Sequence, residues 1–352
     1  MARSLLGLDI GTSAVRAAEV SMKTDPPTLT RFASAALPRG AVVAGEIVDV
    51  DAVVTALREA VRRGRFQVRN TALGLANQKV VVRQIEMPAM EEAELKGALQ
   101  FQAQEFIPIP IEDAILEYQI LEETTNASGE RVVQILLVAA QRDMVSSFVA
   151  VAQGAGLDPS AVDLSSFAVL RALGSSVGIL GAREGEALID IGAAVTNIVV
   201  HEQSSPRFVR ILPMGGDDVT EALATGLNVP WEEAETVKAR IGVTPEGGPI
   251  PVEGAARLIE QRASAFVDEV RGSIDYYLTQ PSAARIATVV VTGGGSRLPG
   301  LLERLSAALH LPVEEGQPLS RLRLGKVDQT PDELAQMGWV CSVAIGLAMR
   351  DP

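Results

Sequence analysis

A short motif that occurs twice decides the fold: Leu8-Asp9-Ile10-Gly11-Thr12-Ser13 near the start of the chain and Ile189-Asp190-Ile191-Gly192-Ala193-Ala194 beyond its middle. In each copy an apolar run enters Asp-Ile-Gly, small residues follow, and a second apolar segment leaves, over 14–20 and 195–201. This pattern predicts a strand, a tight turn with positive φ at Gly11, and a second strand. Because the copies lie about half the chain apart, we expect two halves that begin alike.

The composition of the 352-residue chain, with 47% hydrophobic and 21% charged residues, is that of a folded protein of two or more domains. The net charge of −13 speaks against partners made of nucleic acid or anionic lipid. With Cys341 as the single cysteine and only His201 and His310, neither a disulfide within the chain nor a structural zinc site is expected. No apolar run is long enough to span a membrane and no signal-peptide pattern occurs, so we expect a cytoplasmic protein.

Strands and helices alternate around both copies of the motif. In the first half the sequence predicts a strand over 30–36, a helix over 51–64 capped by Asp49 or Asp51, and a strand over 71–76. For the second half it predicts a strand over 207–212, a helix over 217–225, a strand over 287–292, a helix over 298–309 and an apolar closing helix over 337–349. Gly-rich turns at the strand ends indicate α/β layers.

Two inserts interrupt the halves. The first contains predicted strands over 80–85, 114–121 and 131–139 and helices over 91–107 and 143–153; Leu95, Leu99, Ala103 and Phe106 form one apolar stripe that should pack on the small sheet. The second is helical, with a loop over 244–251. The predicted domains are 1–78 plus 157–184 for the first half, 79–156 for the inserted α+β subdomain, 185–228 plus 285–352 for the second half, and 229–284 for the helical insert.

The repeated motif offers a site for a phosphate and a metal ion. Successive backbone N–H groups of Gly11, Thr12 and Ser13 can converge on one anion, and Asp9 suits a magnesium ion held through water. A single copy is also typical of a plain hairpin, and two unrelated hairpins remain the alternative. Two facing copies would put Asp9 and Asp190 on opposite walls of one cleft, which needs a cation between the carboxylates.

Three further segments leave a ligand contact and a structural role open. The turn Gly293-Gly294-Gly295-Ser296 lies between a strand and a helix, where a ligand can approach the backbone, but it is also typical of a plain connection. After Gly215-Gly216, Asp217 or Asp218 suits a helix cap. Glu235 and Lys238 share a helix face, either as a surface ion pair or as contacts to a ribose and a base. Trp231 and Trp339 are expected to be packing residues.

In this order these segments resemble the actin-like ATPase superfamily, which includes actin, FtsA, DnaK-type chaperones and sugar kinases. The two Asp-Ile-Gly motifs are similar to its two phosphate segments, Gly293 to Ser296 to its adenosine segment, and 343–348 to its second hinge helix. The resemblance implies an α/β fold of the actin-like ATPase type, with two RNase H-like halves around a nucleotide cleft.

The first insert resembles more closely the PilM family of type IV pilus assembly. The resemblance is carried by Gln104-Glu105-Phe106-Ile107-Pro108-Ile109-Pro110-Ile111-Glu112, by Leu116-Glu117-Tyr118-Gln119, and by Val162-Asp163 after the insert. FtsA has a comparable insert but also an amphipathic membrane helix near its C-terminus, whereas this sequence ends at Arg350-Asp351-Pro352. We therefore expect the PilM family rather than FtsA.

The resemblance implies a set of residues around ATP (or ADP) and Mg²⁺. Asp9 and Asp190 would hold the metal ion, mostly through water. The phosphates would be cradled by Gly11, Thr12, Ser13 and Gly192, with Ala193 and Ala194 contributing backbone and Thr196 a hydroxyl. Backbone contacts to the nucleotide would come from Gly215, Gly216, Gly293, Gly294 and Ser296. Glu235 and Lys238 would flank the ribose and base.

The resemblance also implies an adaptor of the inner-membrane pilus platform. It would bind the N-terminal cytoplasmic tail of a PilN-like membrane protein and other platform proteins, and would reach the inner face of the inner membrane through its partner without inserting into it. No residue that orients an attacking water is evident, since Gln141 suits a structural role, so we expect slow or no hydrolysis. The alternatives are a small-molecule kinase or phosphatase of the superfamily and a filament-forming, FtsA-like cytoskeletal protein.

Overall fold

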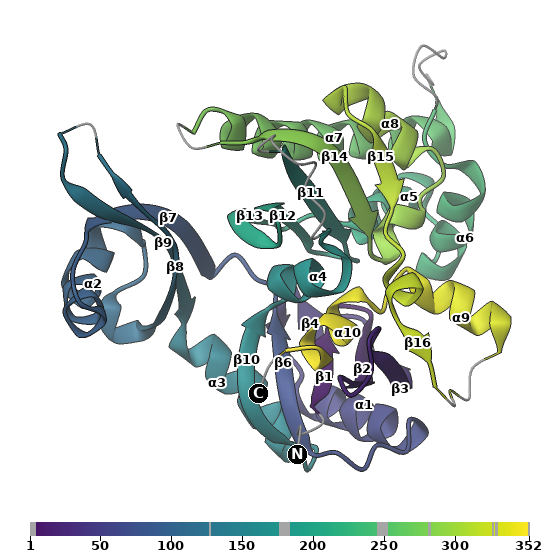
Figure 1. Ribbon diagram of the computed structural model, residues 1–352. Helices are drawn as coiled ribbons and strands as arrows, with labels where there is room; N and C mark the ends of the chain where they lie inside the picture. Colours follow the sequence, from purple (N-terminus) through teal and green to yellow (C-terminus); the bar gives the residue numbers. More distant parts are fainter. Residues whose placement is uncertain are drawn as a thin grey trace.

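Two mixed sheets lie one above the other, and a third, smaller sheet projects from the side (Figure 1). The structure is a computed structural model that describes residues 5–126, 128–175, 184–244, 253–280, 283–325, 327 and 330–350. No helix in these ranges is long and apolar enough to cross a membrane.

The sheet of the N-terminal half has the order β10-β6-β1-β2-β3-β16. Its strands are β1 Leu6–Ile10, β2 Ala14–Ser21, β3 Thr28–Ala36, β6 Asn70–Leu75, β10 Asp158–Leu164 and β16 Arg323–Leu324, with a separate two-stranded ribbon of β4 Val42–Val43 and β5 Glu46–Ile47. Helix α1, Val50–Arg63, packs on β2 and β3. The Asp49 carboxylate accepts a hydrogen bond from Ala52 N at 3.0 Å, so Asp49 is the cap of this helix.

The sheet of the C-terminal half repeats this arrangement, with the order β13-β12-β11-β14-β15. Its strands are β11 Glu184–Ile191, β12 Thr196–Glu202, β13 Ser205–Leu212, β14 Arg285–Thr292 and β15 Val313–Glu315. In both sheets three antiparallel strands are followed by parallel pairs: β1 with β6 and β6 with β10 in the first sheet, and β11 with β14 and β14 with β15 in the second. The predicted duplication is therefore confirmed in the order and direction of the strands.

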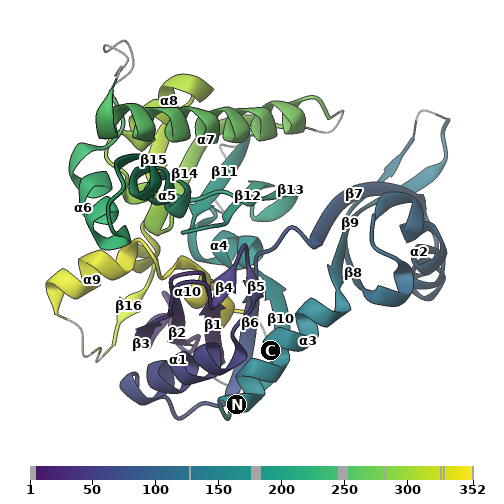
Figure 2. The same cartoon turned by 180° about the vertical axis from the view of Figure 1, so that it is seen from behind.

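Two helices lie between the sheets and two groups of helices cover the outer faces. Helix α4, Ser165–Leu173, contacts strands of both sheets, and α10, Ser342–Ala348, packs on α4, β1, β2 and β6 (Figures 1 and 2). The outer face of the second sheet is covered by α5 Gly216–Leu227, α6 Trp231–Ile241, α7 Gly254–Leu278 and α8 Leu301–Leu309. Leu188, Val199 and Val209 of the second sheet share one buried cluster with the first, so α4 joins the halves through an apolar core.

The first insert is a three-stranded antiparallel sheet in the order β7-β9-β8, from Val80–Pro88, Arg131–Gln141 and Ala114–Thr125. Helix α2, Glu92–Phe106, covers one face, and the predicted stripe packs there, with Leu95, Leu99 and Ala103 buried and Phe106 partly buried. Helix α3, Arg142–Gly154, returns from this sheet and packs on α1, so its buried side chains belong to the core of the N-terminal half.

The end of the chain differs from the single helix predicted over 337–349. Two helices, α9 Pro331–Gly338 and α10, are separated at 339–341. The break has a physical reason: the Trp339 carbonyl accepts a hydrogen bond from Gly293 N at 2.8 Å, so it turns toward the Gly-rich turn after β14. The helix predicted over 298–309 begins only at Leu301, after a 3₁₀ turn at Gly294–Arg297 and Gly300 with φ of +80°. The loop predicted over 244–251 lies almost wholly outside the described residues.

Helix α10 packs on the sheet of the N-terminal half, although the segment 285–352 was assigned from the sequence to the second half. The domain boundaries stay a prediction. The close approach of α10 to α4 depends on Gly346, because a Cβ there would lie 1.8 Å from the Ala168 carbonyl oxygen.

Gly346→Ala should therefore lower the free energy of unfolding by about 3 kcal/mol, since α10 must move away from α4 to admit the methyl group. The measurement is urea unfolding followed by circular dichroism. Gly272→Ala is the matched control: this exposed glycine lies inside α7 with nothing within 4 Å of its Cβ position, and the change should stabilise by about 0.5–1 kcal/mol. Equal midpoints for Gly346→Ala and the unmodified chain would contradict this packing.

Candidate functional site

The two Asp-Ile-Gly turns face each other across a cleft of about 390 Å³ between the halves. This volume is in the range of small-ligand sites. Of the residues predicted from the sequence, the lining contains Asp9, Gly11, Thr12, Ser13, Asp190, Gly192, Ala193, Gly216, Glu235, Lys238, Gly293 and Gly294. Four others lie outside the lining: Ala194, Thr196, Gly215 and Ser296.

Both turns close through one short backbone hydrogen bond. Gly11 N donates to the Ala14 carbonyl at 3.1 Å, and Gly192 N donates to the Val195 carbonyl at 2.9 Å. The expectation of a positive φ at Gly11 is wrong, because neither glycine adopts one. Glycine suits these turns for a different reason: a Cβ at Gly192 would lie 2.6 Å from the carbonyl oxygen that closes the turn.

Asp9 lies at the end of β1 opposite Arg16 of β2. The Arg16 guanidinium donates to the Asp9 carboxylate at 3.2 Å, and the two side chains are only 16% and 15% exposed. Burial raises the pKa of Asp9, and the charge of Arg16 opposes this shift. The carboxylate is thus held in the cleft by one cation from its own hairpin.

Asp190 occupies the same place in the second hairpin, opposite Asn197. The Asn197 amide donates to the carboxylate at 3.2 Å, but an amide brings no compensating charge. Burial first, and then the charge of Asp9 across the cleft, raise the pKa of Asp190 to about 6. The two carboxylates therefore repel each other, and a cation between them would relieve that repulsion.

The residues fit a magnesium ion that keeps most of its ligands from water and phosphate. In the described part of the chain no group of three or more His, Cys, Asp or Glu side chains could hold a metal ion. The walls of the cleft supply two carboxylates, which is the sparse ligation that Mg²⁺ accepts beside phosphates. The Asn197 Oδ1 atom is buried and has no partner among the described residues, so the site still has an unused acceptor.

The Gly-rich turn after β14 forms the floor next to Asp190. Gly293 has a φ of +91°, and a Cβ on it would lie 2.3 Å from the Ile191 carbonyl and 2.6 Å from the Asp190 carboxylate. No other residue fits there without displacing Asp190. Ser296 is buried, and its hydroxyl donates to the Gly293 carbonyl at 2.6 Å, so it shapes the turn rather than facing the cleft.

The start of α5 is bonded to the second turn. Gly216 N donates to the Gly192 carbonyl at 3.0 Å, and Asp217 N donates to the Ala193 carbonyl at 2.8 Å. Asp218 accepts from Gly215 N at 2.7 Å, so it is Asp218 that caps the helix, while Asp217 lines the cleft. The Thr196 hydroxyl, predicted to lie near phosphate, is fully buried and donates to the Met214 carbonyl at 2.8 Å.

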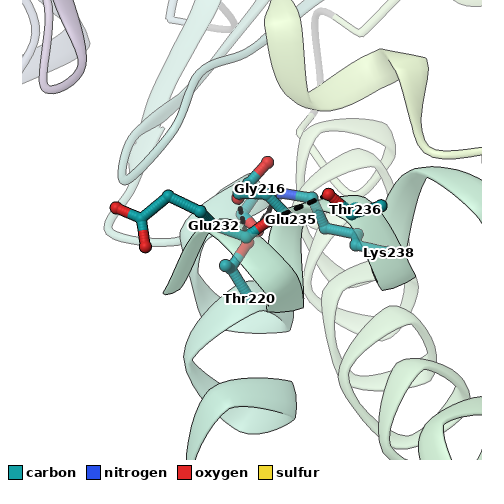
Figure 3. Close-up of polar contacts among 6 residues, drawn as sticks. All are labelled: Gly216, Thr220, Glu232, Glu235, Thr236 and Lys238. Atoms are coloured by element: carbon teal, nitrogen blue, oxygen red, sulfur yellow. Dashed lines mark hydrogen bonds and ion pairs between the residues drawn. The ribbon is translucent and has the colours of Figure 1, made fainter. Parts of the chain in front are cut away.

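Glu235 and Lys238 form a network with α5 rather than an isolated surface pair (Figure 3). The Lys238 ammonium donates to Glu235 at 2.7 Å, to the Thr220 hydroxyl at 2.6 Å and to the Gly216 carbonyl at 3.1 Å. Thr220 also donates to Glu235, whereas the Glu232 carboxylate points away from this group. Lys238 is only 16% exposed, so it anchors α6 on α5 at the edge of the cleft.

Comparison with known proteins shows to which family this chain belongs. A family model described as type IV pilus assembly protein PilM matches residues 7–352. The chain belongs to the PilM family.

The chain is also similar to solved structures and to curated proteins. The structure is similar to a PilM–PilN type IV pilus biogenesis complex, with a TM-score of 0.84 and 29% identity over 100% of this chain and 99% of the other. The sequence is 25% identical to cell division protein FtsA of Neisseria meningitidis, over 92% of this chain and 86% of FtsA. MreB5 of Spiroplasma citri bound to AMPPNP is 14% identical, with a TM-score of 0.54 over 99% of this chain and 96% of the other, and shares the actin-like fold.

Several residues that line the cleft of this PilM-family chain were missed or misjudged from the sequence: Arg16, Asn197, Asp217 and the two tryptophans, Trp231 and Trp339. Arg16 and Asn197 carried a usable signal, because each lies seven positions after its Asp and directly opposite it in the hairpin. Both tryptophans were expected to be packing residues, and the structure puts both along the cleft.

Asp190→Asn should stabilise the ligand-free PilM-family chain at pH 7.5 by about 1–2 kcal/mol, because it removes a partly buried charge that faces Asp9. The Asp190 pKa is about 6 when folded, against 3.8 for the free side chain. Between these values the folded state binds more protons, so stability falls as pH rises through the window. The gain from the substitution should therefore shrink below pH 6 and vanish near pH 4, as measured by thermal unfolding against pH.

The matched control is Asp113→Asn, on an exposed turn of the insert. It should change the melting temperature little at any pH. A gain for Asp190→Asn that stays constant from pH 7.5 to 4 would show that the carboxylates do not interact in this way.

Proposed function

We propose that this chain binds ATP or ADP with Mg²⁺ in the cleft and acts as an adaptor of the type IV pilus inner-membrane platform. In this role it captures the N-terminal cytoplasmic tail of a PilN-like membrane protein. The single observation that carries the nucleotide part is the pair of matching turns with Asp9 and Asp190 on opposite walls of one cleft. The pilus part rests on membership of the PilM family.

In the proposed complex, Asp9 and Asp190 hold Mg²⁺ mostly through water. The N–H groups of Gly11 and Gly192 close their own turns, and that of Gly293 donates to the Trp339 carbonyl. The phosphates would therefore be met by the backbone N–H groups of Thr12, Ser13, Ala193 and Gly294. The Glu235–Lys238 pair would face the ribose and base. Turnover is slow or absent, because no Gln or His lines the described part of the cleft. Lys238 binds Glu235, and Asp9 and Asp190 would hold the metal ion. Asp217 is therefore the carboxylate in the cleft lining that could assist a slow hydrolysis.

A PilN-like partner is supported by the similarity to the PilM–PilN complex over the full described fold. A peptide tail would bring the chain to the inner face of the inner membrane, where other platform proteins would also contact it. The insert suits capture of such a tail, since its sheet projects from the body and is covered by a helix, α2, on one face (Figure 1).

The insert also contacts the second half, which offers a route from nucleotide to partner. Arg207 of β13 lies 3.4 Å from Glu122 of β8 and 3.5 Å from Glu202 of β12, and its side chain is only 14% exposed. Leu136 of the insert and Val209 of β13 belong to the same buried cluster. A nucleotide that binds the closed cleft more tightly than the open one would favour closure. Closure would then move β13, on which the insert rests.

Calorimetric titration tests both parts of the proposal. The N-terminal cytoplasmic peptide of a PilN-like protein from the same genome should bind the Mg-ATP-loaded chain saturably and one to one. Asp9→Ala should weaken Mg-ATP binding by roughly tenfold or more, because the cleft loses a metal ligand and Arg16 loses its partner. Asp113→Ala serves as the control. Absence of peptide binding at high micromolar concentration, in a sample that holds ATP, would sink the adaptor proposal and direct attention to a kinase or phosphatase activity.

Glu122→Gln tests the route between cleft and insert. Mg-ATP should change peptide affinity in the unmodified chain, and this effect should fall by roughly twofold when the charge opposite Arg207 is removed. Affinity for Mg-ATP alone should change little. Glu123→Gln is a matched control, since Glu123 is the next residue on β8 and binds Arg131 within the insert at 2.9 Å. If both variants behave alike, the contact to β13 does not carry the coupling.

A further inference from the structure

We propose that Arg39 and Trp231 form a clamp across the rim of the cleft and that this clamp sets how fast nucleotide leaves. This inference rests on the proposed nucleotide-binding function and adds to it a regulation that neither phosphate turn provides. It assigns Arg39, which lies outside all the motifs, to the retention of ligand.

The clamp joins the two halves of the molecule. Arg39 follows β3 in the N-terminal half, and Trp231 is the first residue of α6 in the C-terminal half. The guanidinium carbon of Arg39 lies 3.7 Å from the centre of the Trp231 ring. This distance is well inside the range of cation–π attraction, for which arginine over tryptophan is the most favourable pair.

The contact lies where the cleft meets solvent, because Trp231 lines the cleft and is half-buried while Arg39 is exposed. The arginine is held near the first turn: two residues earlier, Leu37 N donates to the Ser13 carbonyl at 2.9 Å. On the other side, Trp231 shares one face of α6 with Glu235 and Lys238, four and seven residues further on. The clamp thus spans from the first phosphate turn to the predicted ribose contacts.

Arg39 differs from the other cations at the cleft. Arg16 is paired with Asp9, and Lys238 with Glu235. In the described part of the chain the Arg39 guanidinium donates no hydrogen bond, so its N–H groups remain available to a phosphate oxygen. Its charge also reaches the interior: burial raises the pKa of Asp217 inside the cleft, and Lys238 and Arg39 both oppose that shift.

A contact of this kind suits a gate. The attraction is weak enough to break when the halves separate, yet it brings together two side chains at the rim that a leaving nucleotide must pass. When the clamp is closed, the indole covers part of the cleft and the guanidinium adds positive charge beside a polyphosphate. When the clamp opens, the cleft loses the cover of the indole and the positive charge of the guanidinium at the same time.

The test measures nucleotide release in a stopped-flow instrument. The full chain is loaded with Mg-mant-ATP and mixed with excess unlabelled Mg-ATP. Arg39→Ala and Trp231→Ala should each speed release by about fivefold. The double variant should be no faster than either single one, because each change alone breaks the same contact. Arg131→Ala, which removes the same charge from the exposed hairpin of the insert, should leave the rate unchanged.

The outcomes separate the clamp from the function on which it rests. Unaltered release rates in both single variants, with mant-ATP still bound, would overturn the clamp and leave the nucleotide site intact. Effects that multiply in the double variant would also overturn it, since the residues would then act independently. If the unmodified chain binds no mant-ATP, the proposed function fails and the clamp with it.

Conservative variants keep the test decisive if Trp231→Ala unfolds, as circular dichroism would report. Trp231→Phe retains a ring with a weaker attraction and should give a smaller acceleration. Arg39→Lys keeps the charge without the planar stacking group and should release faster than the unmodified chain but more slowly than Arg39→Ala. Release as fast as from the unmodified chain in Arg39→Lys would attribute the effect to charge alone and reject the clamp.

Discussion

The repulsion between two partly buried carboxylates is the constraint around which this molecule is organised. Asp9 and Asp190 end the first strands of the two sheets and face each other across one cleft, where burial and mutual repulsion disfavour two negative charges. The backbone around them leaves little room for adjustment, since Gly293 places its Cα where any Cβ would touch the Asp190 carboxylate. A proton or a cation is the remaining means of relief.

The two halves share strand order and turn geometry, but the partners of their carboxylates differ. Asp9 has a guanidinium opposite it in the hairpin, and Asp190 has a neutral amide. Burial, and then the charge of Asp9, raise the pKa of Asp190 to about 6, and the neutral amide of Asn197 opposes this shift only by its hydrogen bond. A magnesium ion between the walls would relieve the repulsion between the two carboxylates, while Arg16 holds Asp9 in place. The duplicated fold thus makes the two walls of the cleft similar. The residue opposite each aspartate, Arg16 or Asn197, makes the surroundings of the two carboxylates different.

Much of this was predictable from local sequence, and the rest depends on contacts between distant segments. The repeated Asp-Ile-Gly motif, the Gly-rich turn and the strand patterns predicted two similar α/β halves, because each is encoded within about ten residues, and the resemblance of these segments to a known superfamily implied the actin-like type. Twelve of the sixteen predicted site residues line the cleft. Helix α10 returning to the first sheet, α3 packing on α1, and Trp231 lining the cleft could not be predicted in this way, since tertiary packing determines them. The hydroxyls of Thr196 and Ser296 donate to backbone carbonyls behind the lining, and contact of these two residues with a nucleotide stays a prediction.

Two polar contacts connect the halves on opposite sides of the molecule, and they explain how a small ligand can affect a distant surface. Arg39 meets Trp231 at α6, and Arg207 meets Glu122 at the insert, with α4 and α10 packed between them (Figures 1 and 2). Gly346 lets those two helices approach closely, so they act as a stiff support rather than a soft linker. In the proposed closure, a rotation of one half about this support would change both contacts. In the proposed adaptor, the nucleotide that relieves the Asp9–Asp190 repulsion draws the halves together, and the insert responds because it rests on β13 of the half that moves.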